Sequence, residues 1–460
     1  MYSGNAKELL EKAGAHQGDI VSVESGNGHF EGVLMPRIES GDTACLVLKL
    51  DSGYNIGIEG KNAKVRLVKK GEEKAKKPEV GGVIGGRLPS RISLLSTGGT
   101  ISSKIEYKTG AVVSSLSARD LAAANPRLSQ FAPIKVKSVF SMMSEDMQPS
   151  HWETLAKEVA AELSDGSQGV VITHGTDTMG YTAAALSYAL SNLPGPVILT
   201  GSQRSSDRGS SDAPQNLLCS CAAARGDFAF VGVCMHEGTS DTYNAVHIGT
   251  RVRKSHTSTR AAFRSIGIKP VARINADTCQ IEKIWETAPA KASAQNHSSA
   301  RAPNQSSPAA NLVVHAKFSD NVHLAWMYPG LTRKTVEKWS DYDGVVIAAT
   351  GLGHVNVFFS DMESKYSVLK PIQELISSGV PVVFAPQALS GRLNLNVYAP
   401  QRMLAQVGVI GHGADWLPET AYVKLCWALG QAKDAKKVAE IMMKPTAYDI
   451  TERSAIDELE

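Results

Sequence analysis

Two threonine-rich segments of the sequence contain hydroxyl and carboxylate side chains of the kinds that catalysis by a hydroxyl nucleophile requires. Ser96-Thr97-Gly98-Gly99-Thr100-Ile101 follows the apolar run at 92–95, and Thr173-His174-Gly175-Thr176-Asp177-Thr178 follows Val170-Val171-Ile172. In an open α/β sheet, ligands bind at the carboxyl ends of the strands, and glycines there let the backbone approach a ligand closely. The two segments are therefore candidates for parts of one ligand site.

A threonine hydroxyl is a weak nucleophile at neutral pH and needs a nearby base. A lysine whose pKa is lowered by burial can accept the proton, and a neighbouring carboxylate can hold that lysine in place, although the carboxylate alone raises the pKa of a lysine. Asp177 adjoins Thr176, and Lys254 in Arg251-Val252-Arg253-Lys254 is the candidate lysine. This set predicts a threonine nucleophile supported by a lysine–aspartate pair.

Each of these residues also has a structural explanation. Thr97 and Thr176 suit turns, and Asp177 suits the N-cap of a helix that begins at Thr178. Lys254 would then be one more solvated cation in a basic run. Lys254 lies beyond the fourth predicted strand, so the sequence leaves its contact with Asp177 open.

From residue 91 onward, short apolar runs alternate with helical stretches, a pattern typical of a parallel sheet covered by helices. We predict strands at 92–95, 169–173, 197–200 and 230–235 and helices at 178–192 and 215–225. The first amides of the helix at 178–192 would be able to face an oxyanion. A second, smaller α/β domain is predicted from strands at 345–348 and 382–384 and helices at 419–431 and 435–443.

The first part of the chain has a different pattern, a short helix followed by short strands between turn residues. The helix is predicted at 5–13 and the strands at 19–23, 32–35, 44–50, 54–58 and 63–68, which together favour a small β-barrel. The predicted organisation is a barrel domain at 1–69, a linker at 70–89, an α/β domain with the catalytic loops at 90–285, a low-complexity insertion at 286–311, a C-terminal α/β domain at 312–445 and a tail at 446–460.

Composition excludes several classes of protein. A net charge of +3 produces no global field toward nucleic acid or an anionic membrane. No apolar run reaches the about 18 residues of a membrane helix, and the N-terminus lacks an apolar signal core, so a cytoplasmic location is expected. Six cysteines are too few for a disulfide scaffold, and Cys219 and Cys221 are expected to be buried in a helix. No metal site is predicted.

Residues 90–445 resemble the asparaginase/glutaminase family through Thr97-Gly98-Gly99-Thr100-Ile101 and His174-Gly175-Thr176-Asp177-Thr178. The resemblance implies that Thr100 is the nucleophile and that Thr176, Asp177 and Lys254 form the supporting triad. It also implies substrate contacts by a loop tyrosine, Tyr107, and by Ser144 and Glu145 at the α-amino acid end. An ordinary loop aromatic and a helix-capping serine are the structural alternatives. The family also uses an acidic residue of a neighbouring subunit, which the sequence does not place.

Two N-terminal segments, Phe30-Glu31-Gly32-Val33-Leu34-Met35-Pro36 and the run at 46–57, resemble the D-subunit family of archaeal glutamyl-tRNA(Gln) amidotransferases. This resemblance implies a glutaminase that releases ammonia from glutamine and forms a homodimer within a heteromer. A partner E subunit would bind Glu-tRNA(Gln), ATP and Mg²⁺ and form Gln-tRNA(Gln), with no cofactor on this chain. The alternatives are a stand-alone L-asparaginase and a catalytically silent binding module.

Overall fold

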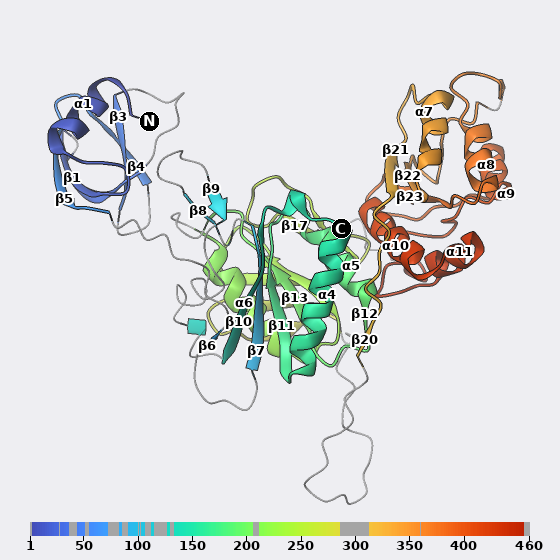
Figure 1. The fold of residues 1–460 in the computed structure, drawn as a ribbon, viewed down its shortest axis with the longest axis horizontal. Helices are drawn as coiled ribbons and strands as arrows, with labels where there is room; N and C mark the ends of the chain where they lie inside the picture. The colour runs from blue at the N-terminus through green and yellow to red at the C-terminus, as the bar shows by residue number, and fades with distance from the viewer. Residues whose placement is uncertain are drawn as a thin grey trace, which may run out of the picture.

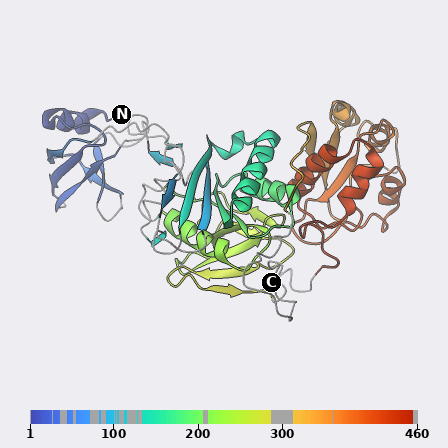
Figure 2. The same ribbon diagram turned by 60° about the horizontal axis from the view of Figure 1, so that its bottom comes forward.

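The computed structural model shows three parts that follow one another along the chain (Figures 1 and 2). It describes residues 2–26, 28–35, 44–50, 55–71, 82–84, 91–99, 101, 103–105, 112–114, 127–128, 133–205, 211–285, 312–358 and 360–454. The predicted insertion at 286–311 and most of the predicted linker lie outside these residues.

The N-terminal part is an antiparallel sheet covered by one helix. The helix is α1 (Gly4–Ala13), and the strands are β1 (Ile20–Ser25), β2 (Gly28–Leu34), β3 (Cys45–Lys49), β4 (Asn55–Glu59) and β5 (Lys64–Lys69). The strand order is β4-β3-β2-β1-β5. Val21, Val23, Leu46 and Leu48 alternate along their strands and are buried under α1, since alternate residues of a strand face the same side. All the predicted strands are present, and closure of the sheet into a barrel stays a prediction.

The central domain is built on parallel strands whose order in the sheet is β10-β7-β11-β13-β14. These strands are β7 (Arg91–Gly98), β10 (Ile134–Met142), β11 (Ser167–Thr173), β13 (Val197–Thr200) and β14 (Val231–His236). The predicted strands and the predicted parallel sheet of this domain are therefore confirmed. Antiparallel strands β15 (Tyr243–Ile248), β18 (Ala272–Asn275) and β19 (Ile281–Lys283) continue one edge. The turn from β14 to β15 is too short for the crossover that a parallel pair needs.

A short strand within the predicted linker at 70–89 lies at the other edge of this sheet. Residues Gly82–Ile84 form strand β6, which pairs antiparallel with the first residues of β10. Val83 and Ile84 are apolar residues with high strand propensity, and the unpaired edge of β10 supplies the hydrogen-bond partners. Residues 82–84, which follow the N-terminal part in the sequence, are therefore part of the central sheet.

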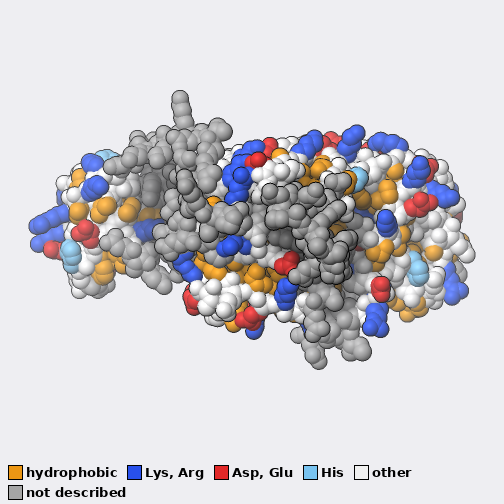
Figure 3. All heavy atoms as spheres, turned by 90° about the horizontal axis from the view of Figure 1, so that it is seen from below, with side chains coloured by type: hydrophobic (Ala, Val, Ile, Leu, Met, Phe, Trp, Pro, Cys, Tyr) orange, Lys and Arg blue, Asp and Glu red, His pale blue; other side chains and the backbone are white. Residues whose placement is uncertain are grey.

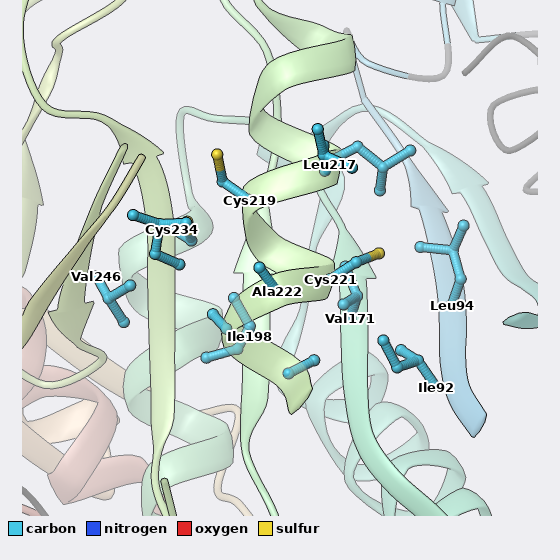
Figure 4. Packing of buried hydrophobic residues seen from close by; sticks show 14 of the residues in the cluster. Ile92, Leu94, Val171, Ile198, Leu217, Cys219, Cys221, Ala222, Cys234 and Val246 are labelled. Carbon is cyan, nitrogen blue, oxygen red and sulfur yellow. The ribbon is translucent and has the colours of Figure 1, made fainter. Parts of the chain in front are cut away.

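Helices α4 (Pro149–Ser164) and α5 (Met179–Ala189) cover one face of the central sheet, and α6 (Ala213–Arg225) covers the other. Ile92, Leu94, Val171 and Ile198 point toward α6 (Figure 4). The helix predicted at 178–192 ends earlier, because Leu190–Ser191 forms strand β12 with β20 (Val313–Val314).

Cys219 and Cys221 lie on α6 within this core, as the sequence predicts. Figure 4 shows the two side chains beside α6 with Cys234 nearby. Burial raises the pKa of Cys221 to about 12, because the apolar surroundings disfavour the thiolate. Both residues therefore act as small apolar groups rather than as nucleophiles.

The C-terminal domain has a parallel sheet of order β21-β22-β23 with helices on both sides. Its elements are β21 (Val322–Trp326), α7 (Arg333–Glu337), β22 (Gly344–Ala349), α8 (Leu369–Ser377), β23 (Val382–Pro386), α9 (Ala399–Gln406), α10 (Pro418–Gln431) and α11 (Ala435–Met443). The predicted strands and helices of this domain are confirmed. Acidic and basic side chains are interspersed over its surface (Figure 3).

Helix α10 joins the central and C-terminal domains. It packs on the C-terminal sheet through Leu425 and Leu429 and meets α5 at Tyr188 and Val423. Tyr181 of α5 and Tyr422 of α10 form an edge-to-face aromatic pair with ring centroids 6.3 Å apart. Within the described residues, no helix has the length and apolar character needed to cross a membrane.

A buried ion pair stabilises this contact between the central and C-terminal domains. Lys424 of α10 and Asp449, both fully buried, form a 2.6 Å salt bridge, and the Tyr188 hydroxyl donates to the same Asp449 oxygen at 2.9 Å. Lys424 also donates to the Lys444 carbonyl at 2.7 Å. Ala447, Tyr448 and Asp449, which were expected to belong to a tail at 446–460, thus contact residues of the central domain.

We predict that Asp449→Ala destabilises the protein by about 3–5 kcal/mol, because it leaves the Lys424 ammonium buried without its anion. The measurement is the shift of the thermal and urea unfolding midpoints. The control is Glu363→Ala, which removes the exposed partner of Arg333 and should change little, since an exposed pair is screened by water. Equal shifts for the two variants would contradict the prediction.

Candidate active site

The candidate site lies at the carboxyl ends of β7 and β11. In chain order β7 is the first parallel strand, β10 the second and β11 the third, and β7 lies between the other two in the sheet. The connections leaving β7 and β11 therefore go to opposite sides, which opens a crevice between their ends. Both threonine-rich segments leave the sheet at this crevice, as the sequence predicts.

Glycines allow the loops at this crevice to pack backbone against backbone. A Cβ on Gly99 would lie 2.3 Å from the Gly175 nitrogen, and a Cβ on Gly98 would lie 2.4 Å from the Met142 carbonyl oxygen. Gly98 and Gly99 also have φ values of 101° and 77°, which a side chain would disfavour. The ends of β7, β10 and β11 are consequently in direct contact.

The first segment contributes a structural threonine next to the candidate nucleophile. Thr97 is buried, and its hydroxyl donates to the Thr173 carbonyl at 3.0 Å, which links β7 to β11. Thr100 and Tyr107 lie outside the described residues. Gly99, the residue before Thr100, is the one that contacts Gly175, so the first segment enters the site beside the second.

The second segment meets the candidate lysine. Lys254 ends strand β16 (Val252–Lys254), which pairs antiparallel with β17 (Phe263–Ser265). The Lys254 Nζ donates to Thr176 Oγ1 at 2.9 Å and to Asp177 Oδ1 at 2.7 Å. The Lys254 side chain is 14% exposed and the Asp177 side chain is 68% exposed. Lys254 is therefore not a freely solvated cation, and the structure brings together the three residues that the sequence left apart.

A hydrogen-bonded histidine fixes the backbone before Thr176. His174 is fully buried, with its Nδ1 2.7 Å from the Gly175 carbonyl and its Nε2 2.9 Å from the Thr182 hydroxyl. The Trp152 indole donates to that hydroxyl at 3.1 Å, which leaves the hydroxyl proton for His174 Nε2. Burial lowers the pKa of His174 to about 4, so the ring is neutral at physiological pH and donates through Nδ1.

Ser144 and Glu145 border the same crevice on the short helix η2 (Ser144–Asp146), directly after β10. Ser144 is buried, and a Cβ on Gly175 would lie 2.7 Å from its hydroxyl oxygen. Thr178 Oγ1 donates to the Ser144 carbonyl at 2.6 Å, and Glu145 is exposed. Thr178 rather than Asp177 is the N-cap residue of α5, so the helix-cap alternative for Asp177 is wrong.

Two arginines close to Lys254, whose contacts the sequence did not suggest, bind acidic residues of the C-terminal domain. Arg251 is fully buried and forms a 2.9 Å ion pair with Asp415 of the C-terminal domain, and Arg253 pairs with Glu419 at 3.0 Å. The alternation in Arg251-Val252-Arg253-Lys254 is the available signal, because it places the arginines on one face of a strand and Lys254 on the other. Their acidic partners are more than 160 residues away in sequence, so no local pattern identifies them.

The described residues contain no cluster of histidine, cysteine and acidic side chains able to bind a metal ion. What they contain is a lysine in contact with a threonine hydroxyl and a carboxylate, beside loops with closely packed backbones. Such a set can transfer a proton to or from a hydroxyl nucleophile at the crevice.

Comparison with known proteins agrees with this geometry. Residues 91–287 match the family described as Asparaginase, N-terminal, and residues 321–442 match the Glutaminase/Asparaginase C-terminal domain. The L-asparaginase of Thermococcus kodakarensis superposes with a TM-score of 0.66 at 30% identity, over 79% of this chain and all of that chain. L-asparaginase I of Vibrio cholerae superposes at 0.64 and 26% identity, over 79% and 99%. The asparaginase-like α/β fold is confirmed.

The N-terminal part decides the family more narrowly. Residues 15–68 match the GatD N-terminal domain, and these asparaginases leave about a fifth of this chain uncovered. The glutamyl-tRNA(Gln) amidotransferase D subunit of Methanobrevibacter smithii is 41% identical over 99% of this chain and 98% of its own length. The corresponding D subunit of Pyrococcus furiosus is 43% identical over 97% of each chain. The chain belongs to the D-subunit family of glutamyl-tRNA(Gln) amidotransferases. The family resemblance of the sequence is thereby confirmed.

We predict that Gly175→Ala lowers kcat/KM for amide hydrolysis by about 10- to 100-fold, because misplacement by about 1 Å has effects of that size. The new Cβ would lie 2.6 Å from the Ser144 Cβ and must displace η2 or the 174–176 loop. The measurement is ammonia release from glutamine and asparagine. Gly238→Ala is the control, since its Cβ would meet nothing within 4 Å. Normal turnover by Gly175→Ala would mean that the close packing does not matter.

Proposed function

We propose that the chain is the glutaminase subunit of a tRNA-dependent amidotransferase. It releases ammonia from glutamine, and a partner E subunit uses that ammonia to convert Glu-tRNA(Gln) to Gln-tRNA(Gln). The observation that carries the proposal is the contact of Lys254 with both Thr176 and Asp177, beside the loop that leads to Thr100. Membership of the D-subunit family supports the choice of glutamine and tRNA over other amides.

In the proposed reaction Thr100 is the nucleophile. Its hydroxyl oxygen attacks the side-chain amide carbon of glutamine, and its proton passes to the unit formed by Thr176, Asp177 and Lys254. The C–N bond breaks as that proton is returned to the leaving nitrogen, so ammonia departs and a glutamyl ester of Thr100 remains. Water then attacks the ester, giving glutamate and the free hydroxyl.

Asp177 and Thr176 have different tasks in this scheme. The carboxylate of Asp177 orients the Lys254 amine, and the short contact to Thr176 Oγ1 carries the proton between the lysine and the reacting hydroxyl. Since the Lys254 side chain is largely shielded from solvent, a proton held there is directed to the site rather than lost to water.

We assign substrate binding to Tyr107, Ser144 and Glu145. Glu145 offers a carboxylate to the α-ammonium group of glutamine, and the Ser144 hydroxyl offers a donor to its α-carboxylate. Tyr107 assists the nucleophile, as the family resemblance implies. The contact of Ser144 with Gly175 supports this assignment, because it puts the serine against the residue that precedes Thr176.

The partner contributes the remaining chemistry in this proposal. ATP and Mg²⁺ act on the E subunit, where they activate the glutamate of Glu-tRNA(Gln), and this chain carries no cofactor. The subunit acts as a homodimer within the heteromer, and charged tRNA as the final acceptor places the reaction in the cytoplasm. The domain division is 1–69, 70–89, 90–285, 286–311, 312–445 and 446–460, with β6 as a catalytic-sheet strand within 70–89.

A stand-alone L-asparaginase is the second candidate. The solved structures that superpose on 79% of the chain are L-asparaginases, and this activity would use the same catalytic residues. It would leave the separate N-terminal sheet without a task, since every candidate catalytic residue lies beyond Arg91.

We predict that Asp177→Ala and Lys254→Ala act as one unit. Each should reduce glutamine turnover at least about 100-fold, and the double variant should lose little more, because residues of one catalytic unit are not additive. The measurement is steady-state ammonia release, with Thr100→Ala as the reference for complete loss. Losses that multiply in the double variant would contradict the triad.

We predict that the isolated chain hydrolyses glutamine weakly and that the E subunit with Glu-tRNA(Gln) raises this turnover at least about tenfold. Any part of the coupling that acts on glutamine affinity must be reciprocal, so glutamine should change the affinity for the partner–tRNA complex by the same factor. The measurements are ammonia release with and without partner, and titration binding. Fast, partner-independent turnover with a preference for asparagine would establish the stand-alone asparaginase instead.

A further inference from the structure

A turn at residues 447–448 contacts Thr250 and Arg251, the two residues directly before strand β16, which carries Lys254. The Ala447 carbonyl accepts a hydrogen bond from the Thr250 hydroxyl at 2.6 Å, and the Tyr448 carbonyl accepts one from Arg251 Nε at 2.7 Å. Ala447 and Tyr448 have φ values of 50° and 66°. Two successive non-glycine residues in the left-handed region are unfavourable by themselves, so other contacts must maintain the turn.

The remaining donors of Arg251 connect the start of β16 to the C-terminal domain. Arg251 Nη1 donates to the Asp415 carbonyl and Nη2 to Asp415 Oδ1, each at 2.9 Å, and both side chains are nearly inaccessible to solvent. Asp415 Oδ1 also accepts from the Thr451 amide at 3.0 Å. Asp415 therefore holds Arg251 on one side and the residues after the turn on the other.

The strand β16 depends on these contacts for its position. Among the described residues its pairing partner is the short strand β17. Its other side is held by the C-terminal domain, where Thr420 donates to the Thr250 carbonyl at 2.8 Å and Glu419 pairs with Arg253. Lys254 is three residues after Arg251, so a displacement of Arg251 at the start of β16 moves the lysine relative to Thr176.

We propose that the turn at 447–448, together with Arg251 and Asp415, positions Lys254 against Thr176 and Asp177. This inference rests on the proposed catalytic function of Lys254. Thr250, Arg251, Asp415 and the turn touch no reacting atom in this scheme and act as positioning groups. In this arrangement the C-terminal domain and the turn at 447–448 support the candidate catalytic site of the central domain without entering it.

The turn is tested by two substitutions at one position. Tyr448→Gly and Tyr448→Val both remove the ring, which is 44% exposed and has an edge contact with Trp285. Glycine accepts the left-handed backbone, whereas a β-branched residue opposes it. In glutamine hydrolysis by the full complex, we expect Tyr448→Val to lower kcat at least about tenfold with KM changed less than about twofold. Tyr448→Gly should stay within about twofold of the wild type.

A second pair of variants distinguishes a loss of positioning from a loss of folding. Thr250→Val removes the hydrogen bond to the Ala447 carbonyl with almost no change of shape, and Thr250→Ser restores a hydroxyl. We expect a kcat loss in the valine variant and recovery in the serine variant, with each variant's unfolding temperature recorded. Equal kcat for valine and glycine at 448, or for valine and serine at 250, would overturn the proposal, and so would a loss confined to KM. Lys254→Ala in the same assay separates the positioning proposal from the proposed function. Normal turnover by Lys254→Ala would refute the catalytic function of Lys254 itself.

Discussion

The close approach of Gly99 to Gly175 is the contact on which the rest of the site depends. Adjacent parallel strands bring their carboxyl ends to one edge, but side chains normally keep the following loops apart. Without a Cβ at either position, the two loops meet backbone to backbone at the point where the sheet reverses its order. Thr97 strengthens this contact by donating to Thr173, and the neutral His174 orders the residues that lead to Thr176.

The second requirement is that a cation reach this edge from a distant part of the chain. Lys254 arrives on a short strand, and the contacts behind that strand come from the C-terminal domain through Asp415, Glu419 and the turn at 447–448. The interface of the two domains thus contains buried charges, which are costly unless they are paired with good geometry. Such pairs fix one relative position of the domains, which an apolar contact alone would define less sharply.

The sequence predictions were most accurate where a local pattern has a local cause. The apolar runs at 197–200 and 345–348 became strands because they are buried on both faces, and Cys219 and Cys221 became core residues of α6. The errors arose from pairing. Residues 82–84 joined β10 as an edge strand, and the helix predicted at 178–192 ends at Ala189 because the next residues pair with β20. Pairing depends on which edge lies nearby, and composition does not reveal that.

By itself the sequence determined the glycine–threonine loops at the ends of two strands and the family resemblance that they carry. These loops depend on residue type and short spacing, which the chain displays directly. The candidate nucleophile and triad followed from the resemblance. Only the tertiary structure decided that Lys254 contacts Thr176 and Asp177, that Thr97 is structural, and that Arg251 binds Asp415 across 164 residues. Contacts between distant residues are selected by the packing of whole domains, because burial and charge pairing act through space and not along the chain.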